Sequence, residues 1–128
     1  MIGHYSIYSA NFVKLAESKQ LTDTQKVERI IKACADYENV HTDVLTGRWR
    51  KREIVEVRQI AMDMAHRNTG LSLLGLGRDF FNRDHSTVIH ARDTVDDLFH
   101  HNRDFREKYL VIQRQVEQKF KLTKKRTF

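Results

Sequence analysis

The sequence predicts an all-helical fold, and three observations lead to that prediction. The 128 residues include no proline and only five glycines, whereas strand-rich domains need frequent turns. Strict alternation of apolar and polar residues, the pattern of a half-buried strand, does not extend over any useful length. Apolar residues instead recur at three- and four-residue intervals, the spacing of an amphipathic helix, and short turn signals separate these stretches.

The N-terminal part of the chain divides into three predicted segments. Residues 1–21 are expected to form an arm or a helix ahead of the domain. A helix over 23–38 begins at Thr22, which has capping-box spacing with Gln25. The apolar residues of this helix recur at three- and four-residue intervals and so lie on one face: Val27, Ile30, Ile31, Cys34 and Ala35. A single helical turn over 42–46 follows, closed by a glycine.

The central part reads as a helix over 53–68 followed by a helix-turn-helix. Ser72 caps a short helix, and after a tight turn Asp84 caps a longer one. The two helices and their turn span 72–99 and have the proportions of a DNA-binding helix-turn-helix. The apolar stripe of the second helix consists of Val88, Ala91, Val95 and Leu98.

The C-terminal residues 100–128 are expected to form one more helix and a basic tail. The apolar stripe of this helix consists of Phe105, Tyr109, Ile112, Val116 and Phe120. We expect this stripe to fold back on the domain rather than to form a dimer seam, which favours a monomer. The tail, 121–128, is expected to fray. The predicted divisions are therefore 1–21, 22–99 and 100–128.

Charge indicates a polyanionic partner. Lys and Arg number 23 against 17 Asp and Glu, a net charge of +6. Net charge alone does not separate nucleic acid from a membrane surface or an acidic protein. No apolar run approaches the roughly 20 residues that span a bilayer, and the N-terminus does not resemble a signal peptide. We therefore expect no membrane partner and a cytoplasmic, nucleoid-associated location.

The sequence predicts no enzyme. Gly70 and Gly75 have the spacing that opens a phosphate loop, but Leu76 and Gly77 stand where Lys-Ser/Thr is required, so no nucleotide is expected. No two histidines have the i, i+4 spacing of a helical metal site. The lone Cys34 falls on a buried helical stripe, which favours a core thiol over a nucleophile. We expect no metal and no other cofactor.

Two stretches remain as candidates for DNA contact. One is the first turn of the second helix, Asp84 to Thr87, whose side chains are short and able to form hydrogen bonds next to exposed backbone amides. The other is Arg48-Trp-Arg-Lys-Arg52, the densest basic stretch. The alternatives are that the first is only a capping sequence and the second only a solvated charge run.

The string Arg83-Asp-His-Ser-Thr-Val-Ile-His-Ala91 resembles the signature of the C-terminal DNA-binding domain (domain IV) of DnaA, the bacterial replication initiator. The resemblance extends upstream through Arg58-Gln-Ile-Ala-Met62 to Arg50-Lys-Arg52 and covers about residues 24–99. It implies a Trp-repressor-like helix-turn-helix. It also leads us to expect a stand-alone protein without the ATPase module of the initiator.

The resemblance implies that the helix starting at Asp84 lies in the major groove of a short asymmetric DNA box. By position, Asp84, His85 and Thr87 would approach base edges, and Ser86 a base or a phosphate. Ala91 would meet a thymine methyl group, although its helical spacing places it in the core stripe, which we favour.

The resemblance also implies roles for residues of the basic stretch and the helix after it. Arg50 would enter the neighbouring minor groove, and Arg58 and Gln59 would face phosphate and groove. Basic side chains would supply most of the affinity by neutralising phosphates. The expected DNA-binding residues are Arg48, Arg50, Lys51, Arg52, Arg58, Gln59, Arg83, Asp84, His85, Ser86, Thr87, Ala91 and Arg92.

The sequence departs from the family pattern at three places. Leu74-Gly75 replaces a common Pro-Glu, Phe81-Asn82 replaces the double glycine of the turn, and Asp93-Thr94 replaces basic residues. The turn angle and the preferred DNA sequence are therefore expected to differ somewhat.

These observations predict sequence-specific binding to double-stranded DNA at DnaA-box-like sites, regulating replication initiation or transcription. The alternative is a protein-interaction adaptor that keeps the fold and binds an initiator or another protein. Its binding face would be the acidic one formed by Asp93, Asp96 and Asp97.

Overall fold

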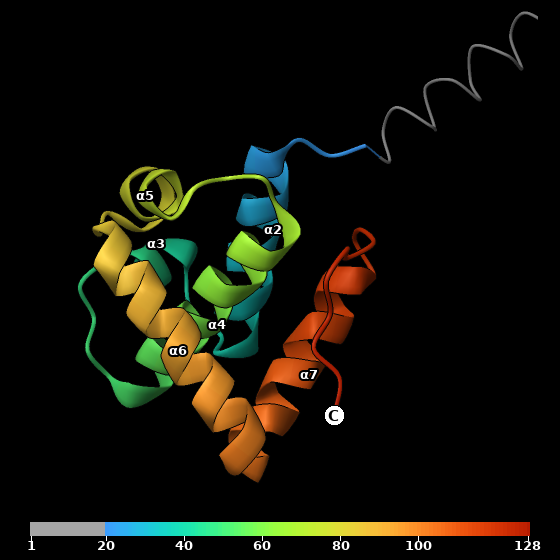
Figure 1. Cartoon of the computed structure of the whole chain (residues 1–128). Coiled ribbons are helices and arrows are strands. Elements are labelled where there is room, and N and C mark those ends of the chain that lie inside the picture. Colours follow the sequence, from blue (N-terminus) through green and yellow to red (C-terminus); the bar gives the residue numbers. More distant parts are fainter. Residues whose placement is uncertain (1–19) are drawn as a thin grey trace, which may run out of the picture.

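The computed structural model describes residues 20–128 as a set of packed helices (Figure 1). No strand occurs among these residues, so the all-helical prediction is confirmed there. Most of the predicted N-terminal arm lies outside the described residues. The elements are α2 (Asp23–Tyr37), α3 (Thr42–Thr46), α4 (Arg52–Asn68), α5 (Leu73–Leu76), the π-helical turn η1 (Gly77–Phe81), α6 (His85–His101) and α7 (Arg103–Glu117).

Helix α4 lies at the centre of the core. It contacts α2, α3, α5 and α6, and α7 closes the core by contacting α2 and α6. The buried faces of these helices form one hydrophobic cluster, which includes the apolar stripe predicted for α7. That stripe is therefore covered by the chain's own helices. The monomeric state itself stays a prediction. In α6, Phe99 rather than Leu98 is the last buried residue of the stripe.

Polar side chains cap the helices where the sequence predicts. Thr22 and Gln25 form the expected capping box, in which each side chain accepts a hydrogen bond from the other's backbone N–H, at 3.1 and 2.9 Å. Ser72 caps α5, and Asp84 caps α6. Asn102 ends α6 and caps α7, so it separates these two helices.

The helix-turn-helix departs from a plain helical turn at η1 and Asn82. The predicted short helix is α-helical only to Leu76 and then widens into η1, where the Asn82 N–H donates to the Gly77 carbonyl. Asn82 adopts left-handed backbone angles (φ 51°, ψ 47°). Asparagine tolerates this conformation better than most residues, so it makes the turn without the double glycine of the family.

The C-terminal tail is not frayed, and that expectation is wrong. Leu122 and Arg126 are buried, and the tail runs back alongside α7 (Figure 1). The Gln113 side chain accepts a hydrogen bond from the Arg126 backbone N–H at 2.9 Å and donates one to the Arg126 backbone carbonyl at 3.0 Å. Asn68 of α4 accepts one from the Lys124 N–H at 2.8 Å. The tail thus belongs to the folded unit.

A buried carboxylate in α4 explains why the tail docks. Asp63 is fully buried, and the Arg126 guanidinium donates to both of its carboxylate oxygens at 3.1 Å. Tyr109 donates a further hydrogen bond at 2.6 Å, and Arg67 lies within 3.2 Å. A buried charge is costly unless it is paired and hydrogen-bonded, so Asp63 needs the cation that the tail supplies.

No helix in residues 20–128 combines the length and the apolar character needed to cross a membrane.

Candidate nucleic-acid interface

The basic stretch predicted from the sequence connects α3 to α4 and lies at the surface. We call residues 48–52 the basic loop; its last residue, Arg52, is also the first of α4. Arg48, Arg50 and Lys51 are exposed, and within residues 20–128 none of the three forms an ion pair. Arg52 is exposed as well but pairs with Glu56 at 3.1 Å. The loop therefore presents three cations that no acidic side chain of the described part neutralises.

Arg58 holds the basic loop in place from the core side. Its side chain is only 6% exposed, and its guanidinium donates to the carbonyls of Leu45 at 2.6 Å and Trp49 at 2.8 Å. Burial and the nearby positive charge of Arg83 lower the pKa of Arg58 to about 10, so it stays charged at neutral pH. This corrects the expectation of a phosphate contact: Arg58 is largely withdrawn from the surface and supports the loop instead.

Arg83 joins the turn before α6 to the end of α3, immediately before the basic loop. Its guanidinium donates to the carbonyls of Thr46 at 3.2 Å and Gly47 at 2.6 Å, and to that of Phe81 at 2.6 Å. Burial, together with the positive charge of Arg48, lowers the pKa of Arg83. Arg58 thus binds the carbonyls of Leu45 and Trp49, and Arg83 binds those of Thr46 and Gly47. These contacts bring the basic loop and the start of α6 together as one surface.

The first turn of α6 is organised by the carboxylate of Asp84. Its Oδ1 accepts hydrogen bonds from the Ser86 hydroxyl at 2.5 Å, the Thr87 backbone N–H at 3.1 Å and the Thr87 hydroxyl at 3.2 Å. The hydrogen bonds from Ser86 and then from the Thr87 N–H lower the pKa of Asp84. Asp84, His85 and Ser86 are exposed, and Thr87 is half-buried. The predicted capping role and an accessible helix tip are therefore both present.

Two residues of the predicted set face inward. Ala91 is 2% exposed and packs in the core, as its helical spacing predicts, and this burial argues against the thymine contact that the resemblance implies. Arg92 is half-buried, with its Nε 3.5 Å from Asp63 and its guanidinium against the His66 ring. The side chain of Arg92 thus serves the buried charge cluster. Gln59 is half-buried on α4.

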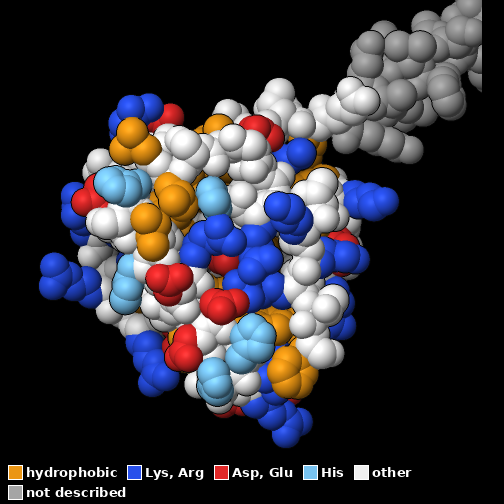
Figure 2. Space-filling view, in the orientation of Figure 1, with side chains coloured by type: hydrophobic (Ala, Val, Ile, Leu, Met, Phe, Trp, Pro, Cys, Tyr) orange, Lys and Arg blue, Asp and Glu red, His pale blue; other side chains and the backbone are white. Residues whose placement is uncertain are grey.

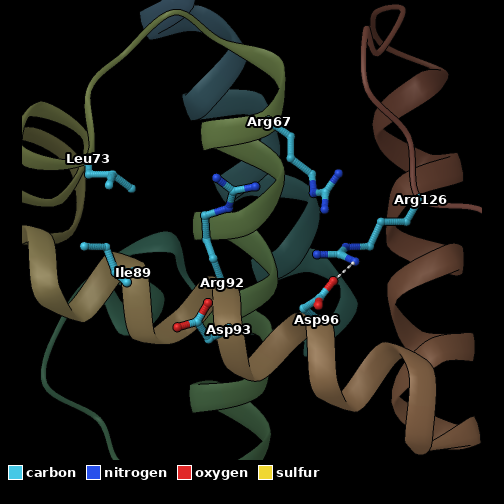
Figure 3. A pocket seen from close by; sticks show the side chains of 7 residues that line it. All are labelled: Arg67, Leu73, Ile89, Arg92, Asp93, Asp96 and Arg126. Carbon is cyan, nitrogen blue, oxygen red and sulfur yellow. Dashed lines mark hydrogen bonds and ion pairs between the residues drawn. The ribbon is translucent and has the colours of Figure 1, made fainter.

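The exposed part of Arg92 lines a pocket between α4, α5, α6 and the tail. Figure 2 shows this face, where basic side chains gather beside acidic ones. In Figure 3 the Arg126 guanidinium meets Asp96, at 3.0 Å. Three arginines and two aspartates line the pocket, and the buried Asp63 pairs with all three arginines, so we assign the pocket no anion-binding role. Its lining residues are Arg67, Leu73, Ile89, Arg92, Asp93, Asp96 and Arg126.

The acidic face of the adaptor alternative is partly engaged within the fold. Asp96 pairs with Arg126, and Asp97 lies 3.2 Å from His101. Asp93 is exposed, and the structure gives it no ion pair among residues 20–128. The three carboxylates therefore do not act as one free acidic surface.

Sequence reasoning missed the supporting roles of Arg58 and Arg83. A signal for the first was available, because Arg58 lies four residues after the buried Ile54 and three before the buried Ala61. Such spacing places it on the core face of α4, where an arginine must find internal acceptors. No comparable signal exists for Arg83, whose partners lie 36 and 37 residues away.

Comparison with known proteins matches residues 27–95 to the helix-turn-helix of the bacterial dnaA protein. The chain belongs to this family. The match begins in α2 and ends in α6, so it encloses the basic loop, the turn and the exposed helix tip. Membership of the DnaA helix-turn-helix family supports DNA binding.

Three relatives are chromosomal replication initiator proteins DnaA. The protein of Flavobacterium psychrophilum is 40% identical over 81 residues. This aligned region covers 63% of the present chain and 17% of the relative. The protein of Chlorobaculum tepidum is 37% identical over 100 residues, which cover 78% of this chain and 20% of the relative. The protein of Corynebacterium jeikeium is 40% identical over 76 residues, which cover 59% of this chain and 13% of the relative. The chain thus spans a fifth or less of the length of these relatives.

Proposed function

We propose that the protein binds double-stranded DNA sequence-selectively, with the first turn of α6 in the major groove and the basic loop at the adjacent minor groove. The single observation that carries this proposal is the set of hydrogen bonds from Arg83 to Thr46, Gly47 and Phe81. The bonds to Thr46 and Gly47 join the turn before α6 to the residues immediately before the basic loop, so both elements can engage one duplex in a fixed register.

Charge and side-chain type determine which part of the DNA each residue contacts. Arg48 and Lys51 neutralise phosphates, which gives affinity without sequence information. Arg50 enters the minor groove, where a narrow A/T-rich segment attracts arginine. His85 and Thr87 contact base edges at the tip of α6 and supply the discrimination. No chemical reaction is performed on the DNA.

The biological role proposed for this binding is regulatory. A protein that occupies DnaA-box-like sites would compete with, or act beside, an initiator and so alter replication initiation or transcription. The relatives bear the name of chromosomal replication initiator, and this chain corresponds to a fifth or less of their length.

A selection from random duplex DNA at two salt concentrations tests the proposal. We expect one asymmetric sequence to be enriched at both concentrations. Lys51→Ala should weaken binding to all sequences alike and reduce the slope of log K against log salt by about 0.9, the value for one phosphate contact. Arg103→Ala is the matched control, because Arg103 is an exposed cation at the start of α7. Loss of all binding at modest salt without any enriched sequence would favour the adaptor.

A further inference from the structure

The basic loop carries an exposed tryptophan that none of the roles above explains. Trp49 is the only tryptophan of the chain, and its side chain is 59% exposed. Tryptophan is among the most buried residues on average, because leaving its large apolar surface in water is unfavourable. It lies between Arg48 and Arg50, two exposed cations. Its position thus combines an aromatic face with positive charge.

The backbone of Trp49 is held in place before any ligand binds. Its carbonyl accepts a hydrogen bond from the buried Arg58 at 2.8 Å, and the neighbouring Gly47 carbonyl accepts one from Arg83 at 2.6 Å. A ligand that contacts the indole therefore does not have to order the loop first. This lowers the entropic cost of binding through this residue.

The immediate surroundings of Trp49 favour an aromatic, anionic ligand. The indole borders a small groove lined by the apolar Val40, Val44 and Ile54 and by the charged Glu38, Lys51 and Glu53. Because this groove contains two carboxylates, the attraction for a phosphate comes from Arg48 and Arg50 on either side of the indole. The flanking cations would attract a phosphate backbone, and an exposed indole face is suited to stacking on a nucleic-acid base. In a paired duplex the base faces are covered by their neighbours, so only an unpaired or unstacked base can offer one.

We propose that Trp49 stacks on an unpaired base, so that the protein binds most tightly where a short unpaired segment adjoins its duplex site on the side of the basic loop. This inference rests on the proposed function for the duplex contact and adds a second DNA structure to it. The α6 tip then reads the paired site, and Trp49 detects the end of the paired region.

Three DNA molecules with the same selected site test the inference. The first is fully paired, the second has a short bubble next to the site on the basic-loop side, and the third has the same bubble on the opposite side. We expect the second to bind roughly 5- to 100-fold more tightly than the first, as base–aromatic stacking predicts, and the third to bind like the first. Because Trp49 is the only tryptophan, its fluorescence should be quenched most by the second DNA.

Substitutions separate the indole from the flexibility of the bubble. Trp49→Ala should abolish the preference for the second DNA, measured as the ratio of its affinity to that of the paired site for the same variant, whereas Trp49→Phe should keep part of the preference. Phe128→Ala is the matched control, since Phe128 is 79% exposed and its ring centroid lies 3.7 Å from the guanidinium of Arg106 in α7, an aromatic side chain beside a cation outside the basic loop. Its variant should behave like the wild type.

The outcomes distinguish this inference from the proposed function. Normal binding to the paired site with equal affinity for all three molecules would overturn the role of Trp49 and leave the proposed function standing. A preference that survives Trp49→Ala would also overturn it, because the gain would then come from the DNA alone. Failure to bind any of the three would overturn both.

Discussion

Arg83 and Gly47, 36 residues apart in the chain, are joined by a hydrogen bond of 2.6 Å from the Arg83 guanidinium to the Gly47 carbonyl. The first lies in the turn before α6 and the second at the end of α3, next to the basic loop. This contact gives the two candidate DNA-binding elements a common position. It places the arginine that opens the family signature in a supporting role.

Arg83→Ala should weaken binding to the selected site by about 1–2 kcal/mol without loss of helical content, because the carbonyls of Thr46 and Gly47, just before the basic loop, lose their donor. Arg83→Lys should also bind weakly, since a single ammonium group cannot reproduce the planar arrangement of guanidinium donors. Fluorescence anisotropy and circular dichroism measure the two effects. Arg78→Ala, which removes an exposed arginine paired with Asp79, is the control. Unchanged affinity in the Arg83 variants would show that the loop keeps its position without them.

His85→Ala and Thr87→Ala should each cost on the order of 1–3 kcal/mol on the selected site and relax the preference at one base position. Competition with single-base variants of that site measures the loss. His101→Ala serves as the control, because His101 is an exposed histidine at the other end of the same helix. If His85→Ala leaves both affinity and base preference intact, the tip of α6 is not the reading element.

Gly77→Ala should destabilise the helix-turn-helix by about 1–3 kcal/mol through overpacking. A Cβ at Gly77 would lie 2.6 Å from the Arg83 carbonyl oxygen and 3.1 Å from a methyl group of Val88, so η1 and α6 would have to separate. Thermal unfolding measures the change. At Gly70 a Cβ would lie 3.5 Å from Asp23, an ordinary contact, and Gly70→Ala should cost little. Equal melting temperatures for the two variants would contradict the close approach.

Arg126→Ala should lower the free energy of unfolding by about 3 kcal/mol, because it leaves the buried Asp63 without its bidentate partner. Urea denaturation provides the measurement. Lys125→Ala removes only the partly exposed pair with Glu117 and should change stability by less than about 1 kcal/mol. A wild-type midpoint for Arg126→Ala would mean that the tail does not contribute to the fold in solution.

Stability should fall on acidification because of Asp63. Burial raises the pKa of this carboxyl, but the hydrogen bonds from Arg126 and Tyr109 outweigh burial and leave it below its ordinary value. The unfolded chain, with a pKa near 4, then binds the proton first. The stabilisation is therefore present above about pH 4 and is lost as the pH falls through the lower pKa of the folded state. Urea midpoints measured between pH 7 and pH 3 should decline less in Asp63→Asn than in the wild type.

Local sequence patterns determined the helices, their caps and the family. Helical spacing located the apolar stripes of α2, α4 and α6, and it placed Ala91 in the core correctly against the contact implied by the resemblance. Thr22, Ser72 and Asp84 cap the helices they precede, because a cap depends on residues only two or three positions away. The string from Arg83 to Ala91 identified the family, since it is a contiguous signature.

Contacts between residues distant in sequence decided the rest. The basic composition of the tail predicts fraying, but the tail docks because Asp63, more than sixty residues earlier, is buried and needs Arg126. In the same way helical spacing places Arg58 on the core face of α4 but does not name its acceptors, and no local pattern marks Arg83 as a support; both find their carbonyl partners only where the fold brings α3 and the basic loop to them. Burial creates these needs for a partner, and only the tertiary structure decides which residues are buried together.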